Sequence, residues 1–185
     1  MSHPGGQGAF THPWQTLALV SVIVVWSTSL RAQQATAVLE YVTPPMPIVW
    51  SQIVDETGQP VPATRLHERV TIVHFWATWC APCVHELPSL IELSRRFSDK
   101  PIQVMAISLD DKGQYAVKKF IERFHIDGLV PYYSPDKALS RDLGVSALPA
   151  SFIANKQGHI VARVQGALDW ASAEVIEFIQ HVIGP

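Results

Sequence analysis

The chain has 185 residues, with 14 basic and 16 acidic side chains and a formal net charge of −2. This length predicts one ordinary domain plus a short additional segment, and it is sufficient to bury a sizeable core. Neither sign of charge forms a long block, and the pairs Arg95–Arg96 and Lys118–Lys119 lie in helix-like patterns. The composition therefore gives no support to a role in binding nucleic acids or other polyanions.

The N-terminal part differs in composition from the rest. Residues 1–13 are polar, and they precede the segment WQTLALVSVIVVWSTSL at residues 14–30. Its apolar centre, residues 17–26, has the length of the hydrophobic region of a signal peptide and is shorter than the roughly 20 residues of a comfortable membrane span. No Lys or Arg precedes this centre, and Arg31 follows it, so a cleaved signal peptide, a retained anchor and a buried segment all stay open.

The sequence accordingly divides into three parts. We expect residues 1–37 to be a polar segment plus a signal peptide or membrane anchor. Residues 38–46 are expected to be a linker, because the run TPPMP at residues 43–47 cannot continue a helix. Residues 47–185 are expected to form the folded domain.

Strands and helices alternate along the predicted domain. Residues 48–66 suggest a short strand pair around a turn at residues 56–58, and RVTIVHFWA at residues 69–77 predicts a central buried strand. The further expected elements are a helix in residues 85–97, a strand at 102–109, helices in 113–126 and 137–144, a hairpin in 150–166 and an amphipathic helix in 172–183. This order predicts an α/β domain with a mixed sheet.

The only two cysteines of the chain, Cys80 and Cys83, are separated by Ala81 and Pro82. Cys80 is expected at the start of a helix, directly after the buried strand, where unpaired backbone N–H groups and the helix dipole stabilise a thiolate. Pro82 fits the first turn because its missing N–H would have had no partner. Cys83, one turn further on, faces back toward Cys80 with its sulfur deeper. We therefore predict that Cys80 attacks a disulfide and that Cys83 resolves the mixed disulfide.

Other uses of two cysteines fit less well. A structural disulfide that closes so short a loop removes only roughly 2 kcal/mol of chain entropy. A zinc or copper(I) site needs more ligands, and the chain has no second Cys-x-x-Cys, although His85 is near in sequence. Covalent haem attachment needs a His where Val84 stands. A metal-carrying assembly factor that uses the two cysteines and a histidine stays open as an alternative of another class.

The segment VTIVHFWATWCAPCVHELPSL resembles the active-site segment of the thioredoxin superfamily, and most closely its TlpA/ResA branch of exported thiol–disulfide oxidoreductases. The resemblance extends over residues 47–183 and includes GALDW at residues 166–170. It implies a thioredoxin fold with an N-terminal β-hairpin extension and a central αβ insert at residues 113–134. In LGVSALPASFI it implies that Pro149 is a cis-proline beside the disulfide and that Leu148 offers its backbone to a substrate strand.

Three more side chains are candidates for the site. Glu86, three residues after Cys83, matches an acidic residue of ResA-like members, and as a buried carboxylate with a raised pKa it could accept the proton of Cys83. His74 departs from the family, which carries Asp or Asn there; it is a candidate for proton transfer or, alternatively, a hydrogen-bonded core histidine. Trp79 is expected in an apolar rim on which partner proteins dock.

The sequence thus predicts an exported protein-disulfide reductase that needs no cofactor and acts in the periplasm or on the outer face of the cytoplasmic membrane. The resemblance implies a membrane electron donor of the DsbD/CcdA type. It implies as substrates the disulfides of apocytochrome c or of copper-assembly proteins of cytochrome oxidase. A net oxidant or isomerase on the same fold stays open, whereas a peroxiredoxin fits poorly because Ala77 stands where a Thr is expected.

Overall fold

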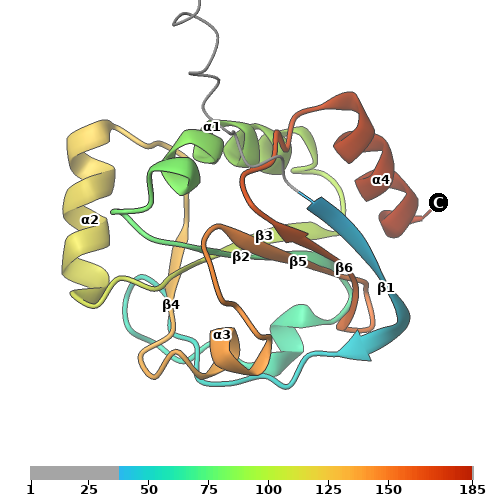
Figure 1. The fold of residues 1–185 in the computed structure, drawn as a ribbon, viewed down its shortest axis with the longest axis horizontal. Helices are drawn as coiled ribbons and strands as arrows, with labels where there is room; N and C mark the ends of the chain where they lie inside the picture. The colour runs from blue at the N-terminus through green and yellow to red at the C-terminus, as the bar shows by residue number, and fades with distance from the viewer. Residues whose placement is uncertain (1–37, 185) are drawn as a thin grey trace, which may run out of the picture. The chain divides into compact units, whose positions relative to one another are not determined.

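The computed structural model describes residues 38–184, which contain one six-stranded mixed sheet (Figure 1). Its order is β1-β6-β5-β2-β3-β4, in which β2, β3 and β4 run parallel and the pairs β2–β5, β5–β6 and β6–β1 are antiparallel. The strands are β1 (Val38–Pro47), β2 (Val70–Trp76), β3 (Ile102–Ser108), β4 (Pro131–Tyr133), β5 (Ala150–Ala154) and β6 (His159–Gln165). The predicted α/β domain with a mixed sheet is confirmed.

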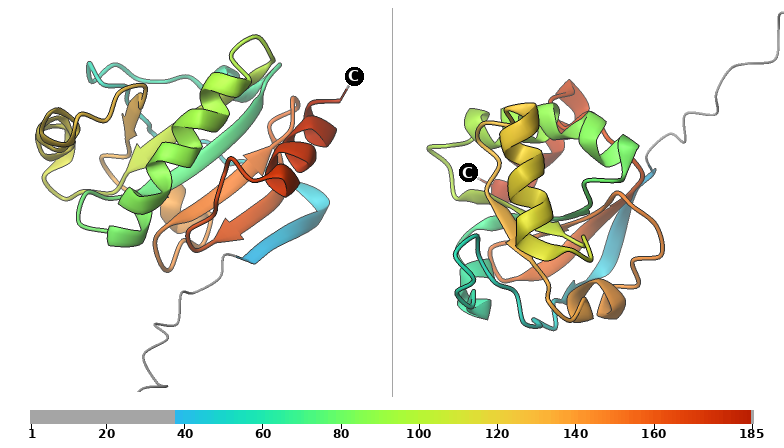
Figure 2. Two further views of the ribbon diagram at one scale, coloured as in Figure 1. Left: turned by 90° about the horizontal axis from the view of Figure 1, so that it is seen from above. Right: turned by 90° about the vertical axis from the view of Figure 1, so that its left-hand side faces the viewer.

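Helices cover both faces of this sheet. α1 (Ala81–Arg96) and α4 (Ala173–Ile183) lie on one face, while α3 (Ala138–Asp142) and the 3-10 helix η1 (Ala63–Leu66) lie on the other (Figures 1 and 2). α2 (Gly113–Phe124) stands beside the edge strand β4, and the two form the αβ insert predicted for residues 113–134.

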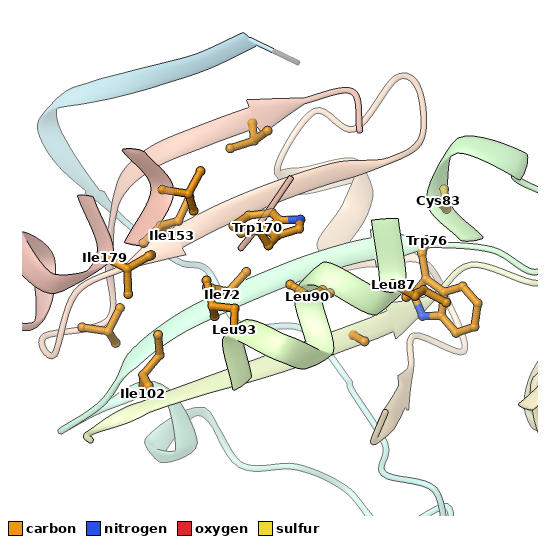
Figure 3. Packing of buried hydrophobic residues seen from close by; sticks show 14 of the residues in the cluster. Ile72, Trp76, Cys83, Leu87, Leu90, Leu93, Ile102, Ile153, Trp170 and Ile179 are labelled. Carbon is orange, nitrogen blue, oxygen red and sulfur yellow. The ribbon is translucent and has the colours of Figure 1, made fainter. Parts of the chain in front are cut away.

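Side chains of β2 alternate between two apolar cores, as the geometry of a strand requires. Ile72 and Trp76 pack into the core that α1 and α4 cover (Figure 3). Val73 and Phe75 point to the other side, where Leu139 of α3 covers them. All seven residues of β2 are buried, which confirms the predicted central strand.

The chain leaves β2, enters α1 and returns as β3, which lies parallel to β2. α1 therefore begins at the carboxyl edge of the parallel strands, the edge at which α/β proteins gather their functional groups. The first turn of α1, which follows Cys80, is held at this edge by the connection from Trp76.

The prediction of a linker at residues 38–46 is wrong, because these residues belong to β1. β1 pairs with β6 from Val38 to Pro47, and the register is interrupted between Tyr41 and Met46. Prolines are tolerated there because β1 is an edge strand and the interruption removes the need for continuous ladder hydrogen bonds.

Of the strand pair predicted around residues 56–58, only an isolated β-bridge is present. Val54 and Pro60 make one isolated antiparallel bridge across a turn in which Gly58 has a positive φ of 84°. Val54 also pairs with Tyr133, so this segment covers the free edge of β4. The N-terminal extension thus protects an edge strand that would otherwise expose its backbone groups.

The candidate signal peptide or anchor at residues 14–30, like all of residues 1–37, lies outside the described residues. Among the helices of residues 38–184, none is both long enough and apolar enough to cross a membrane.

Candidate active site

Cys80 and Cys83 form a disulfide at the N-terminus of α1, with their Cα atoms 5.3 Å apart. Cys80 is the N-cap residue, and the backbone N–H of Cys83 donates to its Sγ at 3.3 Å. Such first-turn N–H groups have no partner inside the helix, so they are available to stabilise a thiolate at Cys80 after reduction. Cys83 is fully buried, whereas 6% of Cys80 is exposed. This difference fits the predicted roles of attacking and resolving thiol.

Asp110 fixes the loop that leads from β2 to Cys80. The backbone N–H of Thr78 donates to Asp110 Oδ2 at 3.0 Å, and the Thr78 hydroxyl donates to Oδ1 at 2.6 Å. The hydroxyl of Ser108 also donates to Oδ2, at 2.8 Å. Sequence reasoning missed Asp110, although an acidic residue just beyond the second of two parallel strands is placed to meet the loop that follows the first.

The proline loop meets the same end of the sheet. The Leu148–Pro149 peptide bond is cis, as the resemblance implied. Phe75 near the end of β2 pairs with Ala150, so Pro149 lies in the loop next to the segment that carries the cysteines. Pro149 is buried, Leu148 is half-buried, and 68% of Trp79 is exposed. Trp79 therefore offers the exposed aromatic surface predicted for the rim.

Glu86 lies one helical turn beyond Cys83 and is almost entirely buried. Its Oε2 accepts the backbone N–H of Leu168 at 2.8 Å and the indole N–H of Trp170 at 3.2 Å. Its Oε1 has no hydrogen bond and lies 3.5 Å from Nε2 of His74. Burial raises the pKa of Glu86 to about 7, although the two donors act to lower it.

His74 is fully buried on β2 beside Glu86. Its Nδ1 lies 2.8 Å from the hydroxyl oxygen of Ser151, the residue opposite it on β5. Burial lowers the pKa of His74 to about 3, so its imidazole is neutral at physiological pH. The structure thus shows His74 as a hydrogen-bonded core histidine, one of the two alternatives, and places it beside Glu86. A role of His74 in proton transfer stays a prediction.

Sequence reasoning did not single out Ser151, Leu168 or Trp170 individually. Leu168 and Trp170 belong to GALDW, a segment that resembles TlpA members but for which the sequence predicted no function. The structure shows that this segment supplies the hydrogen-bond donors to Glu86. Ser151 could have been found from strand pairing, because a polar residue in an otherwise apolar buried strand needs a polar neighbour. In residues 38–184 no three His, Cys, Asp or Glu side chains are grouped in a way that could hold a metal ion.

The site combines a Cys-x-x-Cys disulfide at a helix N-terminus, a cis-proline loop and a mixed sheet, which is the arrangement of a thioredoxin-fold domain. More narrowly, the chain belongs to the Redoxin family, which matches residues 35–176.

Comparison with known proteins agrees with this assignment. The chain is 29% identical over 114 residues to the thiol-disulfide oxidoreductase ResA of Bacillus thuringiensis (strain Al Hakam). The aligned region covers 62% of this chain and 65% of that protein. The match thus spans slightly less than two thirds of the relative's length. The resemblance to the ResA branch is confirmed.

Solved structures confirm the thioredoxin fold. A thiol:disulfide interchange protein of the thioredoxin family from Chlorobium tepidum TLS has a TM-score of 0.63 at 22% identity, covering 77% of this chain and 99% of that one. A thio-disulfide isomerase from Thermus thermophilus has a TM-score of 0.62 at 21% identity, covering 77% and 98%.

Proposed function

We propose that the chain is a thiol–disulfide oxidoreductase that acts outside the cytoplasm and reduces disulfides in partner proteins. The observation that carries the proposal is the position of Cys80 and Cys83, with a backbone N–H aimed at Cys80 Sγ and Cys83 fully buried behind it. Membership of the Redoxin family and similarity to ResA support it.

The reaction begins with the reduced protein. The Cys80 thiolate attacks one sulfur of the partner's disulfide, forming a mixed disulfide and releasing the partner's other sulfur as a thiolate that takes up a proton. Cys83 then loses its proton and attacks Cys80 Sγ. This step releases the partner's second thiolate and forms the Cys80–Cys83 disulfide. Two electrons pass from the cysteine pair to the partner. The partner's two thiolates take up two protons, of which one balances the proton lost by Cys83 and the other comes from the solvent.

Glu86 is the proposed acceptor of the Cys83 proton. It lies one turn further along α1, and burial holds its pKa at about 7, where a carboxyl group can both accept and release a proton at physiological pH. His74 is proposed to assist as a neutral hydrogen-bonding partner of Glu86 and not as a base, because the pKa of its imidazole is far below neutrality.

Docking of the partner is assigned to Trp79, Leu148 and Pro149. Trp79 exposes a large apolar surface directly before Cys80, and an exposed aromatic side chain is a typical anchor of protein interfaces. The Leu148–Pro149 peptide bond is cis, which supports the proposed pairing of an extended substrate strand with the backbone of Leu148.

Export and partners belong to the same proposal. The apolar segment at residues 14–30 is the proposed signal peptide or anchor. Electrons would come from a membrane donor of the DsbD/CcdA type. The proposed substrates are disulfides of apocytochrome c or of cytochrome oxidase copper-assembly proteins, and the likeness to the ResA branch supports both assignments.

Insulin reduction by the full-length chain with dithiothreitol as electron source tests the proposal. Cys80→Ser should abolish activity, whereas Cys83→Ser should accumulate a mixed disulfide that mass spectrometry detects. Glu86→Gln should slow resolution of that intermediate by about 100-fold, the usual contribution of a positioned proton acceptor. A wild-type chain that retains stoichiometric metal and reduces no insulin would favour a metal carrier instead.

A further inference from the structure

Three buried polar side chains form a line across neighbouring elements of the site. Ser151 on β5, His74 on β2 and Glu86 on α1 are each at most 3% exposed. Ser151 Oγ lies 2.8 Å from His74 Nδ1, and His74 Nε2 lies 3.5 Å from Glu86 Oε1. The imidazole therefore stands between a hydroxyl group and a carboxyl group.

The facing atoms of His74 and Glu86 have no other partner. Neither Nε2 nor Oε1 makes a hydrogen bond, and both are buried. Buried polar atoms of this kind are normally paired, and a single proton between them would satisfy both. Oε2 already accepts two N–H groups, so a proton on the neutral carboxyl group belongs on Oε1, facing His74.

Two protonation states satisfy every one of these atoms. When Glu86 is ionised, His74 Nε2–H donates to Oε1, and Nδ1 accepts the hydroxyl proton of Ser151. When Glu86 is neutral, Oε1–H donates to Nε2, and Nδ1–H donates to Ser151 Oγ. A serine hydroxyl can serve in both states because it is donor and acceptor at once.

The proton count of the line is consistent. The neutral state holds three mobile protons, on Oε1, Nδ1 and Oγ, and the ionised state holds two, on Nε2 and Oγ. One proton therefore leaves the line when Glu86 ionises, and the imidazole is neutral before and after.

We propose that Ser151 is a positioning residue which, through a tautomer switch of His74, allows the buried Glu86 to gain and lose its proton. The switch deepens the proposed function and rests on it for its role in turnover, where Glu86 receives the proton of Cys83. The coupling itself is a property of the folded chain and exists without substrate.

The elements around Glu86 present few other ionisable groups within the described residues. α1 contributes Cys83, which can ionise only after reduction, while His85 is exposed on its outer side. β2 contributes His74 and β5 the hydroxyl of Ser151. The loop after β6 contributes the N–H groups of Leu168 and Trp170, and the intervening Asp169 is exposed and accepts the N–H of Ala171.

Two substitutions should favour opposite tautomers of His74. Ser151→Ala leaves Nδ1 without a partner, and because an orphaned buried N–H is worse tolerated than an orphaned acceptor, it favours the Nε2–H tautomer and ionised Glu86. Glu86→Gln keeps its amide oxygen on the two donors and turns its NH₂ toward Nε2. That variant therefore favours the Nδ1–H tautomer at all pH values.

The test is nitrogen-15 NMR of the histidine rings in the oxidised, full-length chain. The His74 signals are those that disappear in His74→Gln, and carbon-13 NMR reports the ionisation of Glu86. In the wild-type chain we expect His74 to change from Nδ1–H to Nε2–H as pH rises, with the same midpoint as Glu86. Ser151→Ala should lower the midpoint of both the Glu86 ionisation and the tautomer change by about one pH unit, so that Nε2–H persists to lower pH. Ser151→Thr should restore the wild-type midpoint.

Ser140→Ala is the matched control, because it removes another buried serine hydroxyl, on α3, whose partner is a backbone carbonyl. It should leave the tautomer and the midpoint unchanged. A single tautomer of His74 at all pH values in the wild-type chain, or an unchanged midpoint in Ser151→Ala, would overturn the proposal. Since no substrate is present, a switching chain that reduces no insulin would refute only the proposed function.

Discussion

The two halves of α1 face the same sheet, but one buries apolar side chains and the other presents the cysteines and a buried carboxyl group. Its C-terminal half buries Leu90 and Leu93 against strand residues such as Ile72 (Figure 3). The N-terminal half, together with its cap, presents Cys80, Cys83 and Glu86, and Glu86 contacts a buried polar group of β2.

The difference lies in what burial achieves in each half. Removing leucine side chains from water stabilises the fold, by about 1.5–3 kcal/mol for a fully buried side chain. Burying a carboxyl group beside an imidazole stabilises nothing by itself and shifts both pKa values toward the neutral forms. One helix thus joins a region whose burial stabilises the fold to a region whose burial shifts pKa values, as the proposed proton transfer requires.

The largest predicted effect concerns the apolar half. Leu90→Ala removes a fully buried side chain from the core, which should lower the free energy of unfolding by about 2–5 kcal/mol. Urea unfolding of the oxidised chain measures it. The Cys80–Cys83 reduction potential and the pKa of Glu86 should not change, and a shift in either would show that the two halves are not separable.

The next effect concerns the pH dependence of stability. Glu86 has a raised pKa, about 7 against an ordinary 4.5, so between these values the free energy of unfolding falls as pH rises. His74 has a lowered pKa, about 3 against 6.5, so between those values the free energy of unfolding rises with pH. From pH 4.5 to 6.5 the two slopes, each about 1.4 kcal/mol per pH unit, cancel in the wild-type chain.

Glu86→Gln should expose the slope of His74 alone. On acidification from pH 6.5 to 4.5, the oxidised variant should lose about 3 kcal/mol of stability relative to the wild-type chain. Urea unfolding of both proteins at the two pH values measures this difference. All other titrating groups are shared by the two proteins, so their contributions to the free energy of unfolding cancel. Parallel stability curves would contradict the assigned pKa shifts.

A smaller effect is expected where Asp110 holds the loop before Cys80. Asp110→Asn replaces one acceptor oxygen by an amide NH₂ that faces donors, which should lower stability by about 1–2 kcal/mol. Hydrogen exchange of the Thr78 amide should become faster. Asp99→Asn, at an exposed residue next to Lys100, is the control and should change neither quantity. Unchanged exchange at Thr78 in the Asp110 variant would remove the anchoring role.

The smallest effect on the fold is expected at the rim. Trp79→Ala truncates a side chain that is 68% exposed, so stability should change by less than about 0.5 kcal/mol. The KM for a protein disulfide should nevertheless rise several-fold, while the rate of reduction of a small-molecule disulfide stays constant. Tyr115→Ala, which removes an equally exposed aromatic side chain on α2, should leave both constants unchanged. Equal KM values for the Trp79 and Tyr115 variants would argue against docking at Trp79.

Much of the fold was predictable because apolar patterning and motif spacing act locally. The β-branched run at residues 69–77 predicted the buried strand β2, and the helix predicted in residues 85–97 is present as part of α1. β1 was missed because its prolines oppose a strand by local preference, whereas pairing with β6 is a long-range contact. The cysteine pair could be found from its spacing alone.

The polar surroundings of the site could be predicted only in part. Glu86 was identified because it matches an acidic residue of ResA-like members three residues after the second cysteine, yet its second donor group, Trp170, is 84 residues away in the chain. The partner of His74 depends on the register between β2 and β5, which pairs it with Ser151. Local sequence spacing does not encode such a register, so these contacts required the structure.

The reduction potential of the Cys80–Cys83 pair tests the central claim most directly. It is measured by equilibrating the full-length chain with glutathione or dithiothreitol buffers and quantifying the free thiols. A value well below about −200 mV is predicted for a reductant that receives electrons from a donor. A value near −120 mV, the oxidising end of the scale, would contradict the proposed direction of electron flow.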